Sequence, residues 1–473
     1  MTVAPSPFLI CPTPATVLQW LKTSQQAAYR SDQATIASLC FPIPTVDPLA
    51  VLSEAPSGQQ CYLDAPTQAI AAWGAVLECR FSGGDRFRKA RQCLAIWKRQ
   101  ICRPCPNPGL GPFFFFSFSF FETAPNGVFA PATVLLPSWQ VVKQSQQSWV
   151  IANVKLGPET ALKPLSAALC RQVQHIARVR KPQLGFRTRS KAANPPPLQL
   201  TAEAALGLKQ SVDQALAVMA QTNLKKQVVA HALDLVSPWP WQRDISLRRL
   251  RSRHPDCYTF AFSQGPQTHF IGASPERLLS LRQGKLVADA LAGSAPRGST
   301  PLLDRCLGQR LLNNPKEQAE HRFVVDFIVT QLKALGLRPH YDAFPTLLKL
   351  SHIQHLHTPI YADLPEHLSP LQLVETLHPT PAVAGVPTAA ACNQIQRTER
   401  SDRGLYAAPF GWVDYQGNSE FIVGIRSALL QGRRARLYAG AGIVKGSDPD
   451  QELAEIQLKL QTLAEVLGNG QRP

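Results

Sequence analysis

Two pairs of glutamates stand three residues apart, each in a segment that favours a helix. Glu317 and Glu320 form the first pair, and Glu452 and Glu455 form the second. Residues three apart on a helix share a face, so each pair presents its carboxylates in one direction. Mg²⁺ commonly takes one or two carboxylates and keeps several waters, so two such helices could build a magnesium site. The spacing also permits a plainer interpretation, in which Glu455 forms a surface ion pair with Lys459.

An arginine in an apolar segment indicates a site for an anion. Arg426 follows Phe421–Ile425, which has the composition of a buried strand. Alternation along such a strand would place Arg426 on the same face as Gly424, where there is room for a ligand. A buried guanidinium must be paired, and its planar fork matches a carboxylate. Gly440 and Gly442 would allow backbone N–H groups to approach the same ligand.

Helices and strands must position these residues. We predict helices over 203–221 and 317–335, and a last helix after Ser447 with Asp448 as N-cap and Pro449 at its first position. The predicted strands are 258–263, 269–273, 285–291 and a hairpin over 410–430 that turns at Gln416-Gly417-Asn418. The mixture predicts an α+β fold, an α/β sandwich whose sheets are covered by helices.

The first 200 residues differ in amino-acid composition from the rest of the chain. They are rich in Pro, Gln and Ser and contain Phe113–Phe121, an aromatic run that reads as a buried strand. The stretch Lys181–Pro197 is the predicted boundary. We therefore divide the chain into a β-rich N-terminal half, 1–200, a region with the candidate site, 201–465, and a C-terminal tail, 466–473.

The composition is that of a folded protein with an excess of positive charge. Of the 473 residues, 45% are hydrophobic and 17% are charged, and the formal net charge is +17. Seven basic residues and no acidic ones lie between Arg171 and Lys191, followed by a Pro-rich stretch. Because no nucleic-acid-binding motif accompanies them, we predict a solvated basic loop and no nucleic-acid partner.

The cysteines and the N-terminal residues indicate a reducing compartment. Cys102-Arg-Pro-Cys105 is not matched by a second CxxC, so we predict a structural role for these two of the eleven cysteines. The first thirty residues lack a basic start followed by a long apolar core. The longest strongly apolar run, Phe113–Phe121, is too short to cross a membrane. We therefore expect a cytoplasmic protein that is not bound to a membrane.

A series of short motifs follows residue 200 in a fixed order. The motifs are Lys226–His231, Gly272–Leu279, Leu291–Gly298, Glu320-His321, Ile353–Leu356, Leu377–Pro387, Arg403–Tyr406, Phe421–Arg426 and Tyr438–Glu455. Together they resemble the chorismate-utilising enzymes, which include isochorismate, salicylate, anthranilate and aminodeoxychorismate synthases. The resemblance covers more than half of the chain, and it implies large, mostly antiparallel sheets packed face to face.

The resemblance also implies roles for the residues named above. Glu320 and Glu455 would bind Mg²⁺, and Glu317 and Glu452 would act through metal-bound water. The metal would bind the ring carboxylate of the substrate, chorismate. The residues implied to contact the substrate are Gly293, Ser294, His355, Tyr406, Arg426, Gly440, Gly442 and Lys459. Of these, Arg426, Tyr406 and the backbone amides near the two last glycines would hold the enolpyruvyl carboxylate.

One lysine distinguishes the reactions of this family. Lys226 stands where water-using members have lysine and ammonia-using members commonly have glutamine. Lys225 allows a slip of one residue, but alignment through Ala232–Leu235 favours Lys226. Lys226 would be the base that activates water at C2, and Glu276 the acid that protonates the departing C4 hydroxyl. A lysine base needs a lowered pKa, and a carboxylic acid that donates a proton needs a raised one.

The resulting prediction is a Mg²⁺-dependent isochorismate synthase, an isomerase that serves menaquinone or phylloquinone biosynthesis. We expect a monomer without a glutaminase subunit. Ala292 precedes Gly293-Ser294, where aminodeoxychorismate synthases with a covalent lysine carry that lysine. Gln227 and His231 depart from the family's usual apolar residue and arginine. The alternatives are a salicylate synthase, which would also eliminate pyruvate, and a basic binding protein that has lost catalysis.

Overall fold

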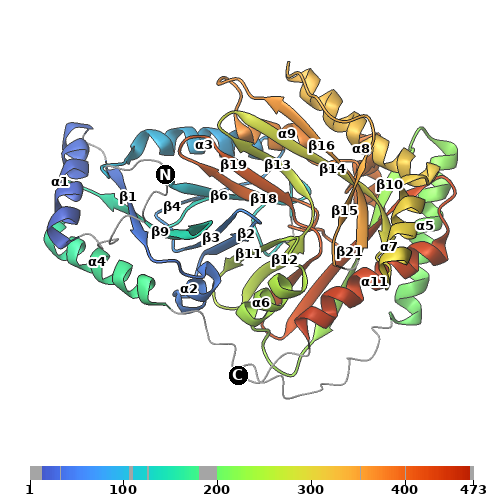
Figure 1. The fold of residues 1–473 in the computed structure, drawn as a ribbon, viewed down its shortest axis with the longest axis horizontal. Helices are drawn as coiled ribbons and strands as arrows, with labels where there is room; N and C mark the ends of the chain where they lie inside the picture. The colour runs from blue at the N-terminus through green and yellow to red at the C-terminus, as the bar shows by residue number, and fades with distance from the viewer. Residues whose placement is uncertain are drawn as a thin grey trace.

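Two large sheets dominate the structure, a computed structural model that describes residues 13–31, 34–105, 110–124, 127–179, 200–351, 353–399 and 401–468. Within these residues the larger sheet has twelve strands and the smaller has nine, with helices packed around them (Figure 1). This arrangement confirms the predicted α+β sandwich. The predicted boundary at 181–197 and most of the tail at 466–473 lie outside the described residues.

The larger sheet combines strands from both parts of the chain. Its order is β17 (Gly385–Val386), β10 (Lys226–Val236), β21 (Arg434–Val444), β20 (Ser427–Gln431), β12 (Thr268–Ser274), β11 (Tyr258–Gln264), β2 (Gln60–Asp64), β3 (Gln68–Trp73), β8 (Trp139–Gln144), β9 (Gln147–Leu156), β1 (Thr35–Ile43) and β5 (Ile101–Cys102). Where β11 pairs with β2, Phe260 lies opposite Leu63. The first 200 residues and the region after them therefore share one hydrogen-bonded sheet.

The smaller sheet is built in the same way. Its order is β15 (Thr346–Lys349), β16 (Ile353–Asp363), β14 (Lys285–Pro296), β13 (Arg277–Arg282), β19 (Ser419–Val423), β18 (Pro409–Asp414), β6 (Phe113–Phe118), β7 (Ala132–Leu136) and β4 (Leu77–Phe81). The aromatic strand β6 pairs antiparallel with β18, so it lies in the interior of the sheet. Because every residue of β6 is buried, the predicted buried strand is confirmed over Phe113–Phe118.

The helices pack on both sheets. They are α1 (Pro14–Ser31), α2 (Pro48–Glu54), α3 (Arg86–Gln100), α4 (Leu162–Arg178), α5 (Ala202–Gln221), α6 (Arg243–Arg253), α7 (Pro301–Leu312), α8 (Pro315–Ala334), α9 (Pro370–Leu377), α10 (Thr388–Thr398) and α11 (Pro449–Leu467). Helices α3, α8 and α9 contact the smaller sheet, and α5, α6 and α11 contact the larger one. Helices α8 and α11 carry the two glutamate pairs, so both pairs are fixed to sheet faces.

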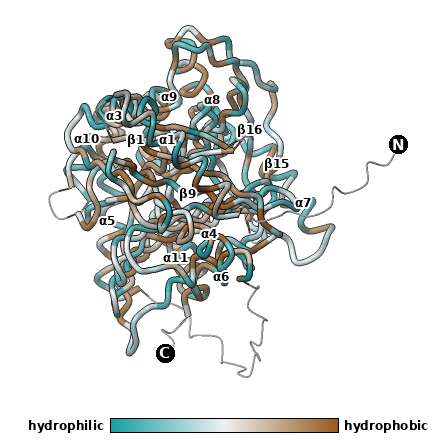
Figure 2. The backbone as a smooth tube through the Cα atoms, turned by 90° about the vertical axis from the view of Figure 1, so that its left-hand side faces the viewer, coloured by the Kyte–Doolittle hydropathy of each residue, from teal (hydrophilic) through white to brown (hydrophobic). Residues whose placement is uncertain are grey.

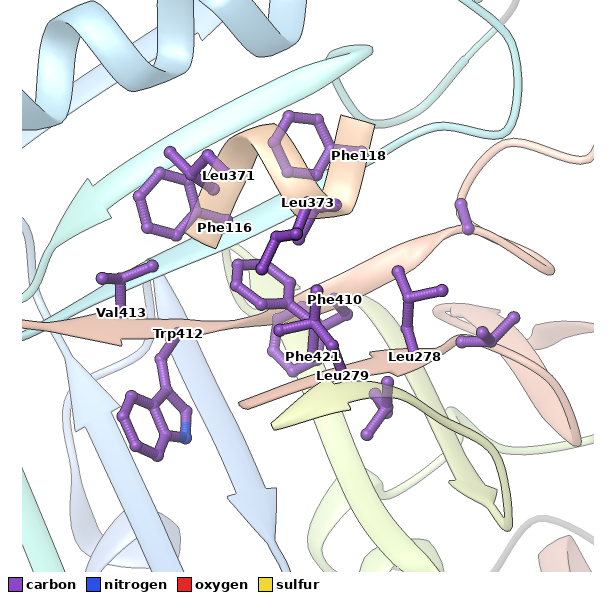
Figure 3. Close-up of a cluster of buried hydrophobic side chains, with 14 of the residues drawn as sticks. Phe116, Phe118, Leu278, Leu279, Leu371, Leu373, Phe410, Trp412, Val413 and Phe421 are labelled. Carbon is purple, nitrogen blue, oxygen red and sulfur yellow. The ribbon is translucent and has the colours of Figure 1, made fainter. Parts of the chain in front are cut away.

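Alternation along the strands divides the apolar side chains between two cores. On β11, Phe260 and Phe262 belong to the core between the sheets, and Ala261 belongs to the core under the outer helices. Figure 3 shows Phe116, Phe410 and Phe421 of the smaller sheet gathered with Leu371 of α9. Figure 2 shows hydrophobic stretches of the chain gathered toward the middle of the molecule. Packed cores on both faces make the sheets a rigid support for the residues at their ends.

Most predicted elements near the site are confirmed. The helices expected at 203–221 and 317–335 are α5 and α8, and the three predicted strands are β11, β12 and β14. The last helix begins as predicted: Asp448 is its N-cap and accepts hydrogen bonds from the N–H groups of Asp450 and Gln451. None of the described helices combines the length and the apolar character that a membrane crossing requires.

The predicted hairpin over 410–430 is only partly right. Strands β18 and β19 do form a hairpin around Gly417, but β19 ends at Val423. The chain then crosses to the larger sheet as β20, with Arg426 at φ 51° between the two strands. Alternation therefore does not set the direction of Arg426, because this residue lies in a crossover and not in a strand.

Candidate active site

Lys226 is a buried residue at the start of β10. Helix α5 ends at Gln221, so Lys226 is neither at a helix end nor on the surface, and only 1% of it is exposed. Its Nζ donates a hydrogen bond to Oε1 of Glu320 on α8, at 2.7 Å. Gly442 of β21 leaves space for this pair: a Cβ there would lie 2.9 Å from Lys226 Cε and 2.8 Å from Glu320 Oε1. The two side chains therefore depend on a glycine in the neighbouring strand.

Glu276 lies in the tight connection between β12 and β13. Its backbone N–H donates to Ser274 Oγ at 3.2 Å, and its carbonyl accepts from the N–H of Val423 at 3.0 Å. The side chain is buried, and burial raises the pKa of its carboxyl group from 4.5 to about 8. The positive charge of Lys226 opposes this rise, and the negative charge of Asp289 adds to it. Glu276 therefore keeps its proton at neutral pH.

The two glutamate pairs converge from α8 and α11. Burial raises the pKa of Glu317, and the charges of Glu320 and Glu455 raise it further. Burial also raises the pKa of Glu452, again with a contribution from Glu455. The charge of Glu320 on α8 also raises the pKa of Glu452, so Glu317 and Glu452 are each affected by a carboxylate of the other helix. The sequence pattern predicted that the members of each pair share a face, and the fold places both pairs together.

Each carboxylate of this cluster has a protein partner. Lys459 Nζ donates to Glu455 Oε1 at 2.6 Å and holds the pKa of that carboxyl group below its usual value. Glu317 Oε2 accepts from the backbone N–H of Ser294 at 3.0 Å, and Glu452 lies 3.7 Å from Lys316 Nζ. The ion pair predicted as the plainer alternative for Glu455 is therefore present. It does not exclude a ligand role, because Glu455 also lines the cavity described below.

The donor set fits a hard divalent cation that other ligands complete. Among the described residues, no group of three or more His, Cys, Asp or Glu side chains forms a ready metal cage. Glu320 and Glu455 nevertheless line the same cavity. Repulsion between the carboxylates contributes to the raised pKa values of Glu317 and Glu452. A cation with oxygen ligands would relieve this repulsion, and Mg²⁺ needs only one or two carboxylates when substrate and water supply the rest.

Arg426 and His355 form a polar wall of the cavity that the acids also line. Arg426 Nη2 lies 3.2 Å from His355 Nε2, and His355 Nδ1 lies 2.9 Å from Ser294 Oγ and 3.3 Å from the carbonyl of Gly293. Burial, with the charges of Arg426 and Lys459, lowers the pKa of His355 to about 3. The imidazole is therefore neutral: Nε2 accepts from the guanidinium, and the Nδ1 proton is donated to Gly293 or Ser294.

Tyr406 and the glycines of β21 form the remaining wall. The ring of Tyr406 stacks on the ring of Tyr438, with centroids 5.1 Å apart and planes inclined by 11°. A Cβ at Gly440 would lie 3.0 Å from the Tyr406 hydroxyl, so this glycine makes room for it. Lys459 Nζ donates to the carbonyl of Gly440 at 2.8 Å and so joins α11 to this strand.

One cavity connects these walls. Of the predicted site residues it is lined by Glu276, Gly293, Ser294, Glu320, His355, Tyr406, Arg426, Gly440, Gly442, Glu455 and Lys459. Lys226, Glu317 and Glu452 stand directly behind the lining, each in contact with it or electrostatically coupled to it. The structure therefore brings together all fourteen predicted residues from positions 226 to 459 of the chain.

Tyr438 and Asp289 contribute to the site and were not among the predicted residues. Tyr438 supports Tyr406 by stacking, although the sequence pattern marked it only as the start of a glycine-containing stretch. Asp289 is buried on β14, is paired with Arg277 at 2.8 Å, and raises the pKa of Glu276. The sequence did contain a signal for Asp289, because it is an acidic residue in the middle of the apolar strand 285–291. A buried charge in such a strand must be paired or functional.

Comparisons with known proteins identify the family of this chain. Residues 22–468 match the family model described as chorismate binding enzyme. The chain is 34% identical over 447 residues to the salicylate biosynthesis isochorismate synthase of Pseudomonas aeruginosa. This match covers 92% of this chain and 91% of that protein. It is 40% identical over 263 residues to the isochorismate synthase MenF of Bacillus subtilis, and this match spans 56% of each chain.

A solved structure shows the same architecture. The fold matches MenF, the menaquinone-specific isochorismate synthase from Escherichia coli, with a TM-score of 0.75 and 27% sequence identity. The match covers 95% of this chain and 100% of the MenF chain. The family match extends over almost the whole chain, and it includes residues 22–200 as well as the region that carries the motifs. The chain therefore belongs to the chorismate-binding enzyme family, and the relatives it matches here are named isochorismate synthases.

Proposed function

We propose that this chain converts chorismate to isochorismate by adding water at C2 as the C4 hydroxyl group leaves. One observation carries the proposal: a buried carboxyl group that keeps its proton lines the cavity, and a buried lysine stands directly behind the lining, bonded to Glu320. Hydration with an allylic shift needs a base for the incoming water and an acid for the departing hydroxyl. Lys226 and Glu276 are the residues of the site that suit these two tasks.

Lys226 acts as the base in this proposal. Its Nζ is paired with Glu320 in the structure, and its neutral amine would accept a proton from the attacking water. The strand β10 and the packing against Gly442 fix the direction of the side chain. Glu320 and Glu455 would hold Mg²⁺, with Glu317 and Glu452 behind them. When bound, the ion supplies positive charge for the ring carboxylate of chorismate.

Glu276 acts as the acid. Its carboxyl group is protonated at neutral pH because burial disfavours its anion. It can therefore donate a proton to the C4 oxygen as the C–O bond breaks, so that water leaves in place of hydroxide. After turnover, the proton that Lys226 took from the attacking water balances the one that Glu276 gave up.

The wall that Arg426 and His355 form binds the enolpyruvyl carboxylate. Arg426 offers its planar guanidinium to the cavity, and neutral His355 orients it by accepting one of its hydrogen bonds. Arginine binds a carboxylate through two parallel N–H···O bonds, which fixes the orientation as well as the affinity. The Tyr406 hydroxyl and the backbone near Gly440 and Gly442 complete this end of the cavity.

Incubation with chorismate and Mg²⁺, followed by chromatographic separation of the products, tests the proposal. Isochorismate as the single product supports it, and EDTA should abolish turnover until Mg²⁺ is restored. Salicylate with pyruvate would mean a salicylate synthase, and an aminated product in the presence of ammonium would mean that the lysine argument is wrong. Absence of turnover would favour the non-catalytic alternative.

The product's destination and the assembly of the protein are separate proposals. We retain menaquinone or phylloquinone biosynthesis as the destination, which deletion of the gene followed by quinone analysis would test. A monomer without a glutaminase subunit should elute at the mass of one chain in light-scattering chromatography. Cell fractionation would test the expected cytoplasmic location.

A further inference from the structure

The strand that carries Lys226 lacks a full neighbour on one side. Strand β10 pairs with β21 along all eleven of its residues. On the other side, β17 pairs only with Lys226 and Gln227. Beyond these two residues β10 is an edge strand, and the N–H and C=O groups on that edge need other partners. Lys226 thus sits in a strand whose outer edge has little support from the sheet.

A buried ion pair occupies this edge. Arg403 Nη2 donates to the carbonyl of Val228 at 3.1 Å. The backbone N–H of Ala230, two residues further on and therefore on the same edge, donates to Glu399 Oε1 at 3.1 Å. The N–H of Val228 donates to the carbonyl of Ala384 at 2.8 Å. Arg403 and Glu399 thus take two of the positions that a longer neighbouring strand would fill.

The pair is held rigidly. Arg403 Nε donates to Glu399 Oε2 at 2.8 Å and Nη2 donates to Glu399 Oε1 at 2.5 Å, while Nη1 donates to the carbonyl of Val383 at 2.7 Å. The guanidinium also lies over the ring of Phe120, 4.3 Å from its centroid. Only 1% of the Arg403 side chain and 10% of the Glu399 side chain are exposed. A buried pair whose hydrogen bonds are satisfied defines one geometry.

The bonds of this pair reach the walls of the cavity. Val228 and Val383 both line it, and both give their carbonyl oxygens to Arg403. Lys226 is two residues before Val228 on the same strand. We propose that Arg403 and Glu399 are positioning residues, which replace the missing edge strand and hold β10 so that Lys226 meets the bound water and substrate. The positioning role rests on the proposed function of Lys226. The support that the pair gives to the strand edge does not depend on that function.

Two substitutions test this role. In Arg403→Lys the charge remains, but one ammonium cannot reach Val228, Val383 and both oxygens of Glu399 at once. Since a displacement of about 1 Å can reduce turnover by 10²-fold, we expect kcat to fall at least about tenfold while the KM for chorismate changes less than about threefold. Glu399→Gln keeps the shape and one acceptor, so it should have the same effect with a smaller magnitude.

Hydrogen exchange provides a readout that does not depend on turnover. Peptides covering 226–232 should exchange faster in both variants, because weakening the Arg403–Glu399 pair loosens the edge of β10, where the pair holds the Val228 carbonyl and the Ala230 N–H. Asp47→Asn is the matched control: it weakens another bidentate pair, with Arg251 at 2.7 and 2.8 Å, whose residues do not line the cavity. The control should lose stability with unchanged kcat below its melting temperature.

The outcomes separate the two proposals. Unchanged exchange at 226–232 in Arg403→Lys and Glu399→Gln would refute the support of the strand edge. Faster exchange with unchanged kcat, or a loss of kcat that the Asp47→Asn control shares, would refute the positioning role. If the wild-type protein forms no isochorismate, the proposed function fails, and the exchange experiment still decides whether the pair supports β10.

Discussion

Replacement of Glu276 by glutamine should make the protein inactive and, above pH 5, more stable. The amide has nearly the shape of the carboxyl group but cannot donate the proton to the departing hydroxyl, so we expect kcat to fall by about 10²- to 10⁴-fold. The effect on stability has an independent origin. Folding removes the carboxyl group from water and raises its pKa from 4.5 to about 8, whereas glutamine has no charge to bury.

The direction and size of the stability effect follow from proton linkage. Between pH 4.5 and 8 the folded protein binds a proton at Glu276 that the unfolded chain releases, so the free energy of unfolding falls as the pH rises. One such proton changes this free energy by roughly 1.4 kcal/mol per pH unit. Glu276→Gln should therefore gain up to about 4 kcal/mol over the wild-type protein between pH 5 and pH 8, and no more above pH 8.

Urea unfolding of both proteins at pH 5, 6, 7, 8 and 9 measures this difference directly. All other titrating groups are common to the two chains and cancel. The same pKa predicts that kcat/KM of the wild-type enzyme declines about tenfold per pH unit above about pH 8, as the acid of the free enzyme loses its proton. A difference in unfolding free energy that does not vary with pH would refute the assignment of a buried, protonated carboxyl group at this position.

Four further changes test other parts of the site. Lys226→Gln should reduce kcat by about 10²- to 10⁴-fold with an unchanged circular dichroism spectrum, and near-normal turnover would refute the base assignment. Gly442→Ala places a methyl group 2.8 Å from Glu320 Oε1 and 2.9 Å from Lys226 Cε, so it should reduce activity strongly, whereas Gly157→Ala, whose Cβ would lie 3.9 Å from its nearest neighbour, should not. Arg426→Gln should raise the KM for chorismate by about 10- to 100-fold in steady-state assays, because a charge-assisted bond is lost; an unchanged KM would contradict its role. Asp289→Asn removes a negative charge that raises the pKa of Glu276, so the alkaline limb of the kcat/KM profile should move to lower pH, and a shift to higher pH would contradict the electrostatic argument.

Much of the site was predictable because its signals are local. The separation of Glu317 from Glu320 places both on one helix face whatever the rest of the chain does. The cap at Asp448 and the turn at Gly417 likewise depend on a few neighbouring residues. The order of the motifs after residue 200 was enough to indicate the family, and the resemblance suggested the roles that we propose for Lys226 and Glu276.

The direction of Arg426 could not be predicted from local signals. The apolar run before it has the composition of one strand, yet the chain leaves the smaller sheet after Val423 and enters the larger one as β20. A positive φ at Arg426 makes this crossing possible. Such a conformation is uncommon for residues other than glycine and costs free energy, and only the surrounding packing maintains it.

The amino-acid sequence by itself determined which side chains are available and which of them share a helix face or a strand. Only the tertiary structure decided their protonation and their partners. Burial raises the pKa of Glu276, and pairing across 94 positions of the chain joins Lys226 to Glu320. The edge of β10 is completed by Arg403 and Glu399, which lie more than 160 residues further along the chain. The physical reason is that desolvation and Coulomb interactions depend on distances in space, which neighbouring residues in the sequence do not define.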